Sequence, residues 1–163
     1  MEKHKETIET NQINSNNWRD SICLQDAAIG FFLSGRMLHL ERQKSYGLER
    51  VRLDAPYYSN ILSSIEIFLK LILLKEGHQL QKLKIHKIYD LYKKLKTDTK
   101  SNIKSEIDGS GKYLYSLERA LEDNNSIFVR ARYNDLTESQ SLIFPHFEVL
   151  EALASYLYEN YKN

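Results

Sequence analysis

The sequence predicts an all-α protein, folded as an antiparallel up-and-down bundle of four to five main helices. The 163-residue chain contains only two Pro and six Gly, and no stretch alternates apolar and polar residues over the length of a strand. Apolar residues instead recur at helical spacing through much of the chain. A chain of this length normally forms one domain and buries roughly 70% of the surface that its unfolded state exposes.

The first 16 residues are rich in Asn, Lys, Glu and Thr and contain few apolar side chains. This composition predicts a disordered tail over residues 1–16, followed by a single domain over residues 17–163. Asn16 or Asn17 can cap the first helix, which we expect to extend to about Tyr46. The tail lacks the apolar segment of a secretory signal, so no targeting sequence is predicted before the fold.

The first helix combines an apolar stripe with two glycines. Gly30 and Gly35 each cost a helix about 1 kcal/mol relative to Ala, so each indicates close packing or a tolerated weakness. The apolar residues at helical spacing are Trp18, Ile22, Ile29, Phe32, Leu33, Met37 and Leu40.

The second helix is expected at the centre of the bundle because apolar residues lie all round it. A charged connector is predicted over Tyr46–Asp54, with Asp54 capping the helix and Pro56 close behind. Gly77 ends the helix. The run Ile61–Leu74 is about 14 residues long and includes two charges, so it predicts a core helix rather than a membrane span.

Shorter helices follow. A third begins at His86, in the segment HKIYDLYKKL, and a weak helix spans Asp98–Ile107 before a Gly-Ser-Gly break. Another helix is predicted over Lys112–Glu122, and the last over Pro145–Tyr161, where Pro suits the first turn. Many of the eleven tyrosines fall at stripe positions, where they seal the core edge or supply an interface.

A net charge of +1 hides a strong asymmetry along the chain. Residues 70–104 contain ten Lys against three acidic residues, whereas residues 105–163 contain ten acidic residues against five basic ones. The Lys-rich segment either attracts an anionic partner or is a solvated face. The single cysteine, Cys23, fits a reducing cytoplasm, and neither it nor the histidines have the spacing of a metal site.

An ordered set of residues spans the second helix, the start of the third and the segment before the last. Its members are Glu66, Lys70, Gly77, His86 with Leu91, and Phe128, Val129, Arg130, Ala131, Arg132 and Tyr133. This order resembles the HEPN domain, a helical bundle named for nucleotide binding in higher eukaryotes and prokaryotes. The resemblance covers roughly residues 27–161.

The resemblance implies that a polar cluster forms around two charges inside the second helix, where unpaired charges are costly. Such a cluster either fixes the register of the helices or binds a phosphate or nucleotide, with Arg as a bidentate donor and Tyr as a stacking face. The candidate ligand-binding residues are Glu66, Lys70, His86, Arg130, Arg132 and Tyr133.

Many HEPN proteins are ribonucleases, in which a His follows an Arg by about four to six residues and the pair supplies a cation and a proton-transfer group. None of the five histidines of this chain stands at that offset from an Arg. The resemblance therefore implies a non-catalytic member. The alternative is a ribonuclease with a non-standard site, such as Arg36 with His39 or His86 with Arg132.

Three functions are open at this point. The first is non-catalytic binding of a nucleotide or an RNA end through the Lys-rich face and Arg132. The second is protein contact, as a homodimer through the first or last helix or beside a nucleotidyltransferase-type protein, in the toxin–antitoxin or defence context that the resemblance implies. The third is the non-standard ribonuclease. No cofactor and no membrane partner are expected.

Overall fold

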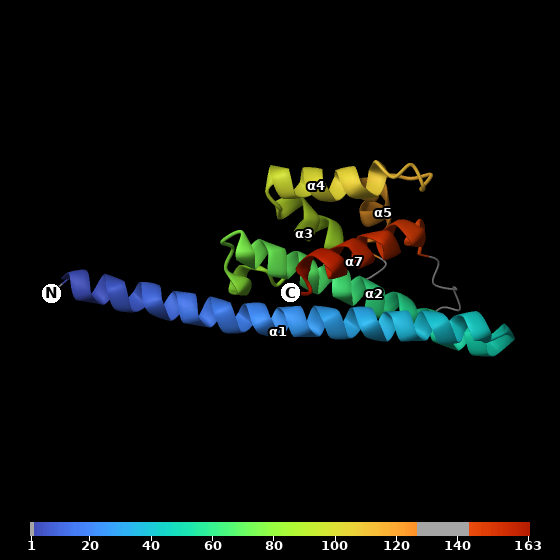
Figure 1. Ribbon diagram of the computed structural model, residues 1–163, viewed down its shortest axis with the longest axis horizontal. Helices are drawn as coiled ribbons and strands as arrows, with labels where there is room; N and C mark the ends of the chain where they lie inside the picture. Colours follow the sequence, from blue (N-terminus) through green and yellow to red (C-terminus); the bar gives the residue numbers. More distant parts are fainter. Residues whose placement is uncertain (1, 127–143) are drawn as a thin grey trace.

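The computed structural model describes the backbone of residues 2–126 and 144–163, and the side chains within those ranges from residue 19 onward. This described part is helical and contains no strand, so the predicted all-α class is confirmed. The long helices α1 and α2 lie side by side, and the shorter helices cover the other side of α2 (Figure 1). The helices are α1 (Glu2–Lys44), α2 (Gly47–Lys75), the short 3-10 helix η1 (Leu80–Lys82), α3 (Ile88–Lys94), α4 (Thr97–Asp108), α5 (Leu117–Asn124) and α7 (Phe147–Tyr161).

The bounds of α1 include residues 2–16, for which the sequence predicts a disordered tail. The side chains of this segment lie outside the described residues. The tail over residues 1–16 and the single domain over residues 17–163 therefore stay predictions. At its other end α1 stops at Lys44, two residues before the predicted limit at Tyr46.

α2 begins at Gly47, so the predicted connector over Tyr46–Asp54 and the predicted cap at Asp54 are wrong. Gly47 has a φ of +58°, which lets the chain reverse direction in the short link between α1 and α2. Pro56 lies in the helix interior, where it removes one backbone hydrogen bond. Pro56 and Arg52, whose carbonyl would otherwise accept that bond, are both exposed to solvent.

Arg42 of α1 holds the early turns of α2 in place. Its guanidinium forms an ion pair with Asp54 and donates a hydrogen bond to the Tyr58 hydroxyl (3.2 Å). The same group lies over the Tyr57 ring, with Cζ 5.0 Å from the ring centroid, which adds a cation–π attraction. Asp54 thus links α2 to α1 through Arg42 and does not cap α2.

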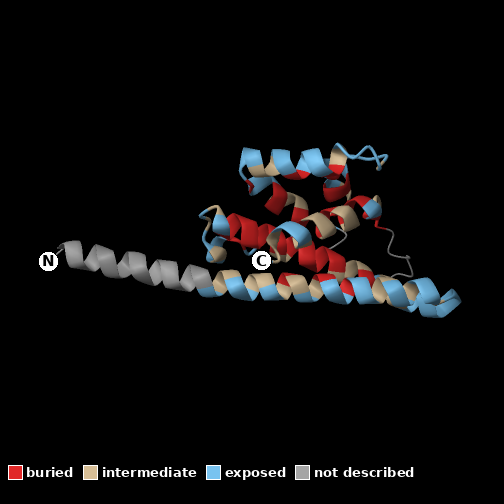
Figure 2. Cartoon of the chain, viewed as in Figure 1, coloured by how far each residue is buried: buried red, intermediate tan, exposed pale blue. Residues whose placement is uncertain are grey.

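α2 is the centre of the core. It is long and apolar enough to cross a membrane by length and composition, but 78% of its most apolar window is buried inside the bundle (Figure 2). Helices α1, α3 and α7 all contact it. The apolar residues that surround α2 thus pack against other helices, as their pattern predicts. Its buried apolar side chains are Tyr57, Ile61, Leu62, Ile65, Phe68, Leu69, Leu71, Ile72, Leu73 and Leu74.

The two glycines of α1 differ in their surroundings. A Cβ atom on Gly35 would lie 2.7 Å from Cδ1 of Ile61, so Gly35 permits the close approach of α1 and α2. A Cβ atom on Gly30 would meet no heavy atom of the described residues within 4 Å. Gly30 costs the helix about 1 kcal/mol relative to Ala, and no close packing among the described residues offsets this cost.

Gly77 ends α2 as predicted. With a φ of +98°, it allows His78 N–H to bond the Leu73 carbonyl (2.9 Å) and its own N–H to bond the Leu74 carbonyl (3.1 Å). These two bonds form a Schellman motif, which satisfies carbonyl groups that the helix end leaves without donors. The chain then turns through η1 towards α3.

The later helices follow the predictions with shifted starts. α4 matches the predicted weak helix to within one residue at each end, whereas α3 starts at Ile88, two residues after His86. α5 starts at Leu117 rather than Lys112, because the Ser116 hydroxyl accepts the Arg119 N–H (3.3 Å) and caps the helix there. α7 starts at Phe147, after His146 in a left-handed conformation.

Tyr92 of α3 is buried, and its hydroxyl lies 3.4 Å from the Lys100 carbonyl. Burial, followed by the charges of Glu118 and Asp108, raises its pKa to about 12. An unfolded chain ionises this tyrosine near pH 10, while the folded protein keeps its proton. The shift therefore stabilises the fold below pH 10, and this contribution is lost as the pH rises towards 12.

We predict that Tyr92→Phe loses less stability between pH 9.5 and 11.5 than the wild type does, because the variant has no phenol to ionise. Urea unfolding at both pH values measures the difference, and the exposed Tyr46→Phe serves as the control. Equal losses of stability in the wild type and in Tyr92→Phe would contradict the raised pKa of Tyr92.

Candidate functional site

Glu66 and Lys70 form an ion pair inside the core helix α2. The Lys70 Nζ donates to the Glu66 Oε1 over 2.7 Å, and both residues are buried. This is the i, i+4 pair that the sequence predicts, in the favourable orientation with the acid first. The pair is required because a lone charge at this depth is strongly destabilising.

His86 joins the pair from the segment between η1 and α3. Its Nδ1 lies 3.0 Å from the same Oε1 of Glu66, and 40% of its side chain is exposed. Glu66 and His86 also take part in further interactions. One carboxylate thus connects a buried ammonium group to an imidazole that reaches the surface, and this arrangement orients the ring. We call these three residues the Glu66 cluster.

The structure therefore brings together three of the six residues that the resemblance suggests. Glu66, Lys70 and His86 meet as expected. Arg130, Arg132 and Tyr133 lie outside the described residues, so their place in the cluster stays a prediction.

The Lys-rich segment continues on both sides of His86. Lys93 pairs with Asp90 (2.8 Å), and Lys104 pairs with Asp108 (3.3 Å). Other lysines of this segment are exposed and are in no ion pair with another described residue, so their charges are available to an anion. These are Lys82, Lys84, Lys87, Lys94 and Lys96.

We predict that Glu66→Ala lowers the free energy of unfolding by about 3 kcal/mol, because it leaves the Lys70 ammonium buried without its carboxylate. Urea or thermal unfolding measures the loss. Lys87→Ala, at an exposed position next to His86, should change stability by less than about 0.5 kcal/mol. A Glu66→Leu, Lys70→Met double variant should regain part of the loss, since it removes both charges. An unchanged stability in Glu66→Ala would mean that the pair contributes nothing to folding.

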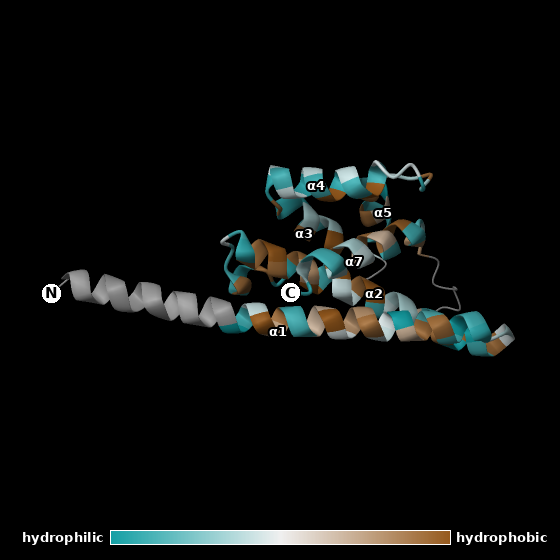
Figure 3. Cartoon of the chain, viewed as in Figure 1, coloured by the Kyte–Doolittle hydropathy of each residue, from teal (hydrophilic) through white to brown (hydrophobic). Residues whose placement is uncertain are grey.

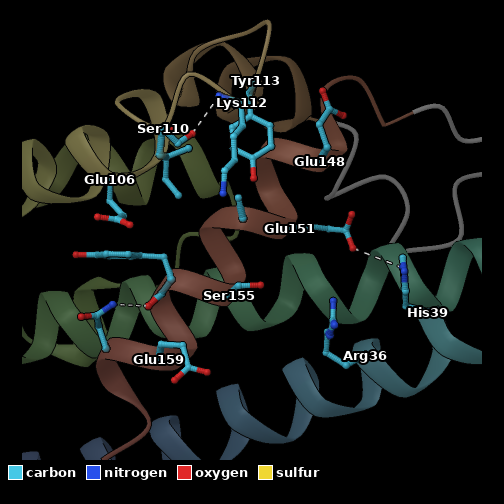
Figure 4. A pocket seen from close by; sticks show the side chains of 14 residues that line it. Arg36, His39, Glu106, Ser110, Lys112, Tyr113, Glu148, Glu151, Ser155 and Glu159 are labelled. Atoms are coloured by element: carbon cyan, nitrogen blue, oxygen red, sulfur yellow. Dashed lines mark hydrogen bonds and ion pairs between the residues drawn. The ribbon is translucent and has the colours of Figure 1, made fainter.

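A second group of polar residues surrounds a cavity of about 650 Å³ between α1, α4 and α7 (Figure 4). Figure 4 shows Arg36 and His39 entering from α1, Glu106 from α4, and Glu148, Glu151 and Glu159 from α7. From the sequence, Arg36 and His39 could be recognised only as an isolated pair. The carboxylates are missed because no motif links residues so far apart in the chain.

Glu151 organises one wall of this cavity. The Tyr57 hydroxyl donates a hydrogen bond to its Oε1, and His39 Nδ1 lies 3.6 Å from the same oxygen. The His39 and Tyr57 rings are 5.3 Å apart. Burial, and then the bond to Glu151, raises the pKa of Tyr57 well above its usual range, so this phenol stays protonated.

The cavity has the wrong charge for a phosphate. Four carboxylates line it, from Glu106, Glu148, Glu151 and Glu159, and its cations are Arg36 and Lys112. Proximity of Arg36 to His39 alone does not make a ribonuclease site, since RNA must approach this excess of negative charge.

We therefore predict that the protein does not cleave tRNA or short single-stranded RNA in EDTA at micromolar enzyme concentration. The reasons are the absent Arg-to-His spacing and the acidic lining of the Arg36–His39 cavity. Gel analysis of labelled RNA tests this. Cleavage that is lost in His39→Ala or His86→Ala, but kept in His78→Ala, would overturn the prediction and identify the catalytic histidine.

Among the described residues, no group of three or more His, Cys, Asp or Glu is placed to hold a metal ion. Comparison of the chain with family models, curated proteins and solved structures finds no match. The functional argument accordingly rests on the residues of this chain.

Proposed function

We propose that this chain is a HEPN-like helical module that binds the phosphate of a nucleotide or an RNA end without cleaving it. The observation that supports this most directly is the Glu66 cluster, in which a buried ion pair holds the half-exposed His86 at the surface of a Lys-rich segment.

The cluster contributes orientation. Contact with Glu66 directs one edge of the His86 ring inward. In the sequence, His86 lies between two exposed lysines, Lys84 and Lys87. A ring held in this way can contact an anion with little further loss of side-chain freedom, which favours binding. Arg132 is proposed to add the bidentate contact that a phosphate prefers.

The lysines contribute attraction over longer range. Residues 70–104 have a net charge of +7. A patch with this excess of positive charge raises the local concentration of anions and speeds their association, and the effect weakens as salt screens it. Binding of RNA should therefore fall steeply with ionic strength.

The biological setting is a further part of the proposal. A toxin–antitoxin or defence role, with a nucleotidyltransferase-type partner, rests on the resemblance to HEPN domains. The alternative, a non-standard ribonuclease, is favoured only by the shared cavity of Arg36 and His39, and the carboxylates around that cavity oppose it.

We predict that inorganic phosphate, ATP or a short 5′-phosphorylated RNA raises the melting temperature of the wild-type protein, since a ligand of the native state stabilises it. The Lys84→Glu, Lys87→Glu double variant should weaken RNA binding at least tenfold at 50 mM salt. Both positions are exposed, so folding should be preserved. Fluorescence anisotropy measures the affinity.

Two further variants locate the site. His86→Ala and Arg132→Ala should each remove the rise in melting temperature produced by phosphate. Lys162→Ala, at a partly exposed lysine directly after α7, should bind as the wild type does. No rise with any of the three anions, or equal binding by Lys84→Glu, Lys87→Glu and wild type, would leave the Glu66 cluster a purely structural feature.

A further inference from the structure

Two basic groups share one oxygen of the buried Glu66 carboxylate. The Lys70 Nζ lies 2.7 Å from Oε1, and the His86 Nδ1 lies 3.0 Å from the same atom. Figure 3 shows hydrophobic residues along the later turns of α2, where Phe68 and Leu69 are fully buried. Water therefore screens this carboxylate little, and its charge acts strongly on the two groups that face it.

The contact with Glu66 fixes which nitrogen of the His86 ring carries a hydrogen. An ionised carboxylate only accepts hydrogen bonds, so the Nδ1 atom at 3.0 Å from Oε1 is the donor. In a neutral imidazole one nitrogen is a donor and the other is an acceptor. The neutral ring therefore presents a lone pair at Nε2, and a lone pair repels the oxygen atoms of an anion.

An anion can bond to Nε2 of His86 only after that atom gains a proton. Both nitrogens of an imidazolium are donors, so the charged ring can hold Glu66 with one edge and an anion with the other. The side chain is 40% exposed, which lets an anion reach the ring. An imidazole normally gains this proton near pH 6.5, so at higher pH the binding of an anion requires proton uptake.

The charges around His86 make the proton depend on the anion. Glu66 favours the imidazolium, whereas the Lys70 ammonium group on the same carboxylate opposes it. The exposed Lys84 and Lys87 flank His86 in the chain and also oppose it. A bound anion reverses the effect of these lysines, because it attracts the charged ring more strongly than the neutral one.

The acidic residues on the neighbouring helices act on a different cation. Asp90 of α3 pairs with Lys93 (2.8 Å), and this hydrogen bond is the main reason why the pKa of Lys93 is raised. Glu122 of α5 adds to the same effect on Lys93. Of the described acidic residues, Glu66 is the one that contacts His86.

We propose that an anion binds at His86 together with one proton, so that the affinity of the site for a phosphate group rises as the pH falls from 8 to 6. This inference rests on the proposed phosphate binding and adds its regulation by pH. Above the pH range in which the ring titrates, each bound anion must bring a proton, and the affinity falls by up to about tenfold per pH unit. Below that range the ring is already charged, and the affinity no longer depends on pH.

Sulfate is the probe that isolates this effect. It is a tetrahedral dianion whose charge is constant between pH 5 and 9. A phosphate monoester, in contrast, gains a proton near pH 6 and changes its own charge. Lysine side chains normally keep their charge up to about pH 9. A change in sulfate affinity between pH 8 and pH 6 therefore reports a histidine.

Isothermal titration calorimetry in two buffers of different ionisation enthalpy counts the protons taken up. The wild-type protein should take up nearly one proton per sulfate at pH 8 and almost none at pH 5.5. Its affinity for sulfate should rise at least fivefold from pH 8 to pH 6. His86→Gln should bind with the same affinity at each pH and without proton uptake, because its amide can donate a hydrogen bond but does not titrate.

Two controls separate the ring from its surroundings. His78→Gln changes another partly exposed histidine and should retain the proton uptake of the wild type. The double variant Lys84→Ala, Lys87→Ala should weaken sulfate binding at every pH but still take up a proton at pH 8, because these lysines supply attraction and not the proton. Circular dichroism checks the fold of each variant, and His86→Asn replaces His86→Gln if the latter does not fold.

The outcomes distinguish this inference from the function on which it rests. Sulfate binding with equal affinity at pH 6 and pH 8, without proton uptake, would overturn the link to a proton and leave phosphate binding intact. Proton uptake that persists in the folded His86 variants would also overturn it, since another group would then carry the proton. An absence of sulfate and phosphate binding at every pH would contradict the proposed function itself, and this inference with it.

Discussion

The architecture depends on the burial of the second half of α2, which from Ile61 onward is apolar on every side. A helix of this kind cannot be stable at a surface, so other helices must cover it all round. α1 covers one side, and α7 and α3 pack on the other side (Figure 1). The same constraint explains the Glu66 cluster, because charges placed on such a helix must find partners within the bundle. The candidate site is thus a consequence of the core helix rather than an addition to it.

Much of this architecture follows from local patterns. The continuous apolar residues of α2 predict its central position, and Gly77 predicts its end through a backbone conformation that other residues rarely adopt. The Glu66–Lys70 spacing predicts their contact, since residues four apart are neighbours on any helix. The contact of His86 with this pair does not follow from a spacing rule, because His86 comes from another segment. It was expected only through the resemblance to HEPN domains.

The errors arise where distant residues decide the outcome. Local chemistry favours Asp54 as a cap and Pro56 near the helix start, yet Arg42 bonds Asp54 from another helix and α2 continues past both. The bond between Tyr57 and Glu151 joins residues 94 positions apart, and no spacing rule anticipates it. The acidic cavity is therefore visible only in three dimensions.

The position of Pro56 divides α2 into two parts with different resistance to opening. Before it, Leu48 and Val51 are exposed and the turns depend on Arg42 of the neighbouring helix. After it, Tyr57 is buried, and from Ile61 to Leu74 every side chain except that of Ile67 is buried. One continuous helix therefore contains a segment that can fray in isolation and another that opens only when the whole bundle does. The hairpin between α1 and α2 can fluctuate without disturbing the ion pair two turns and more beyond the proline.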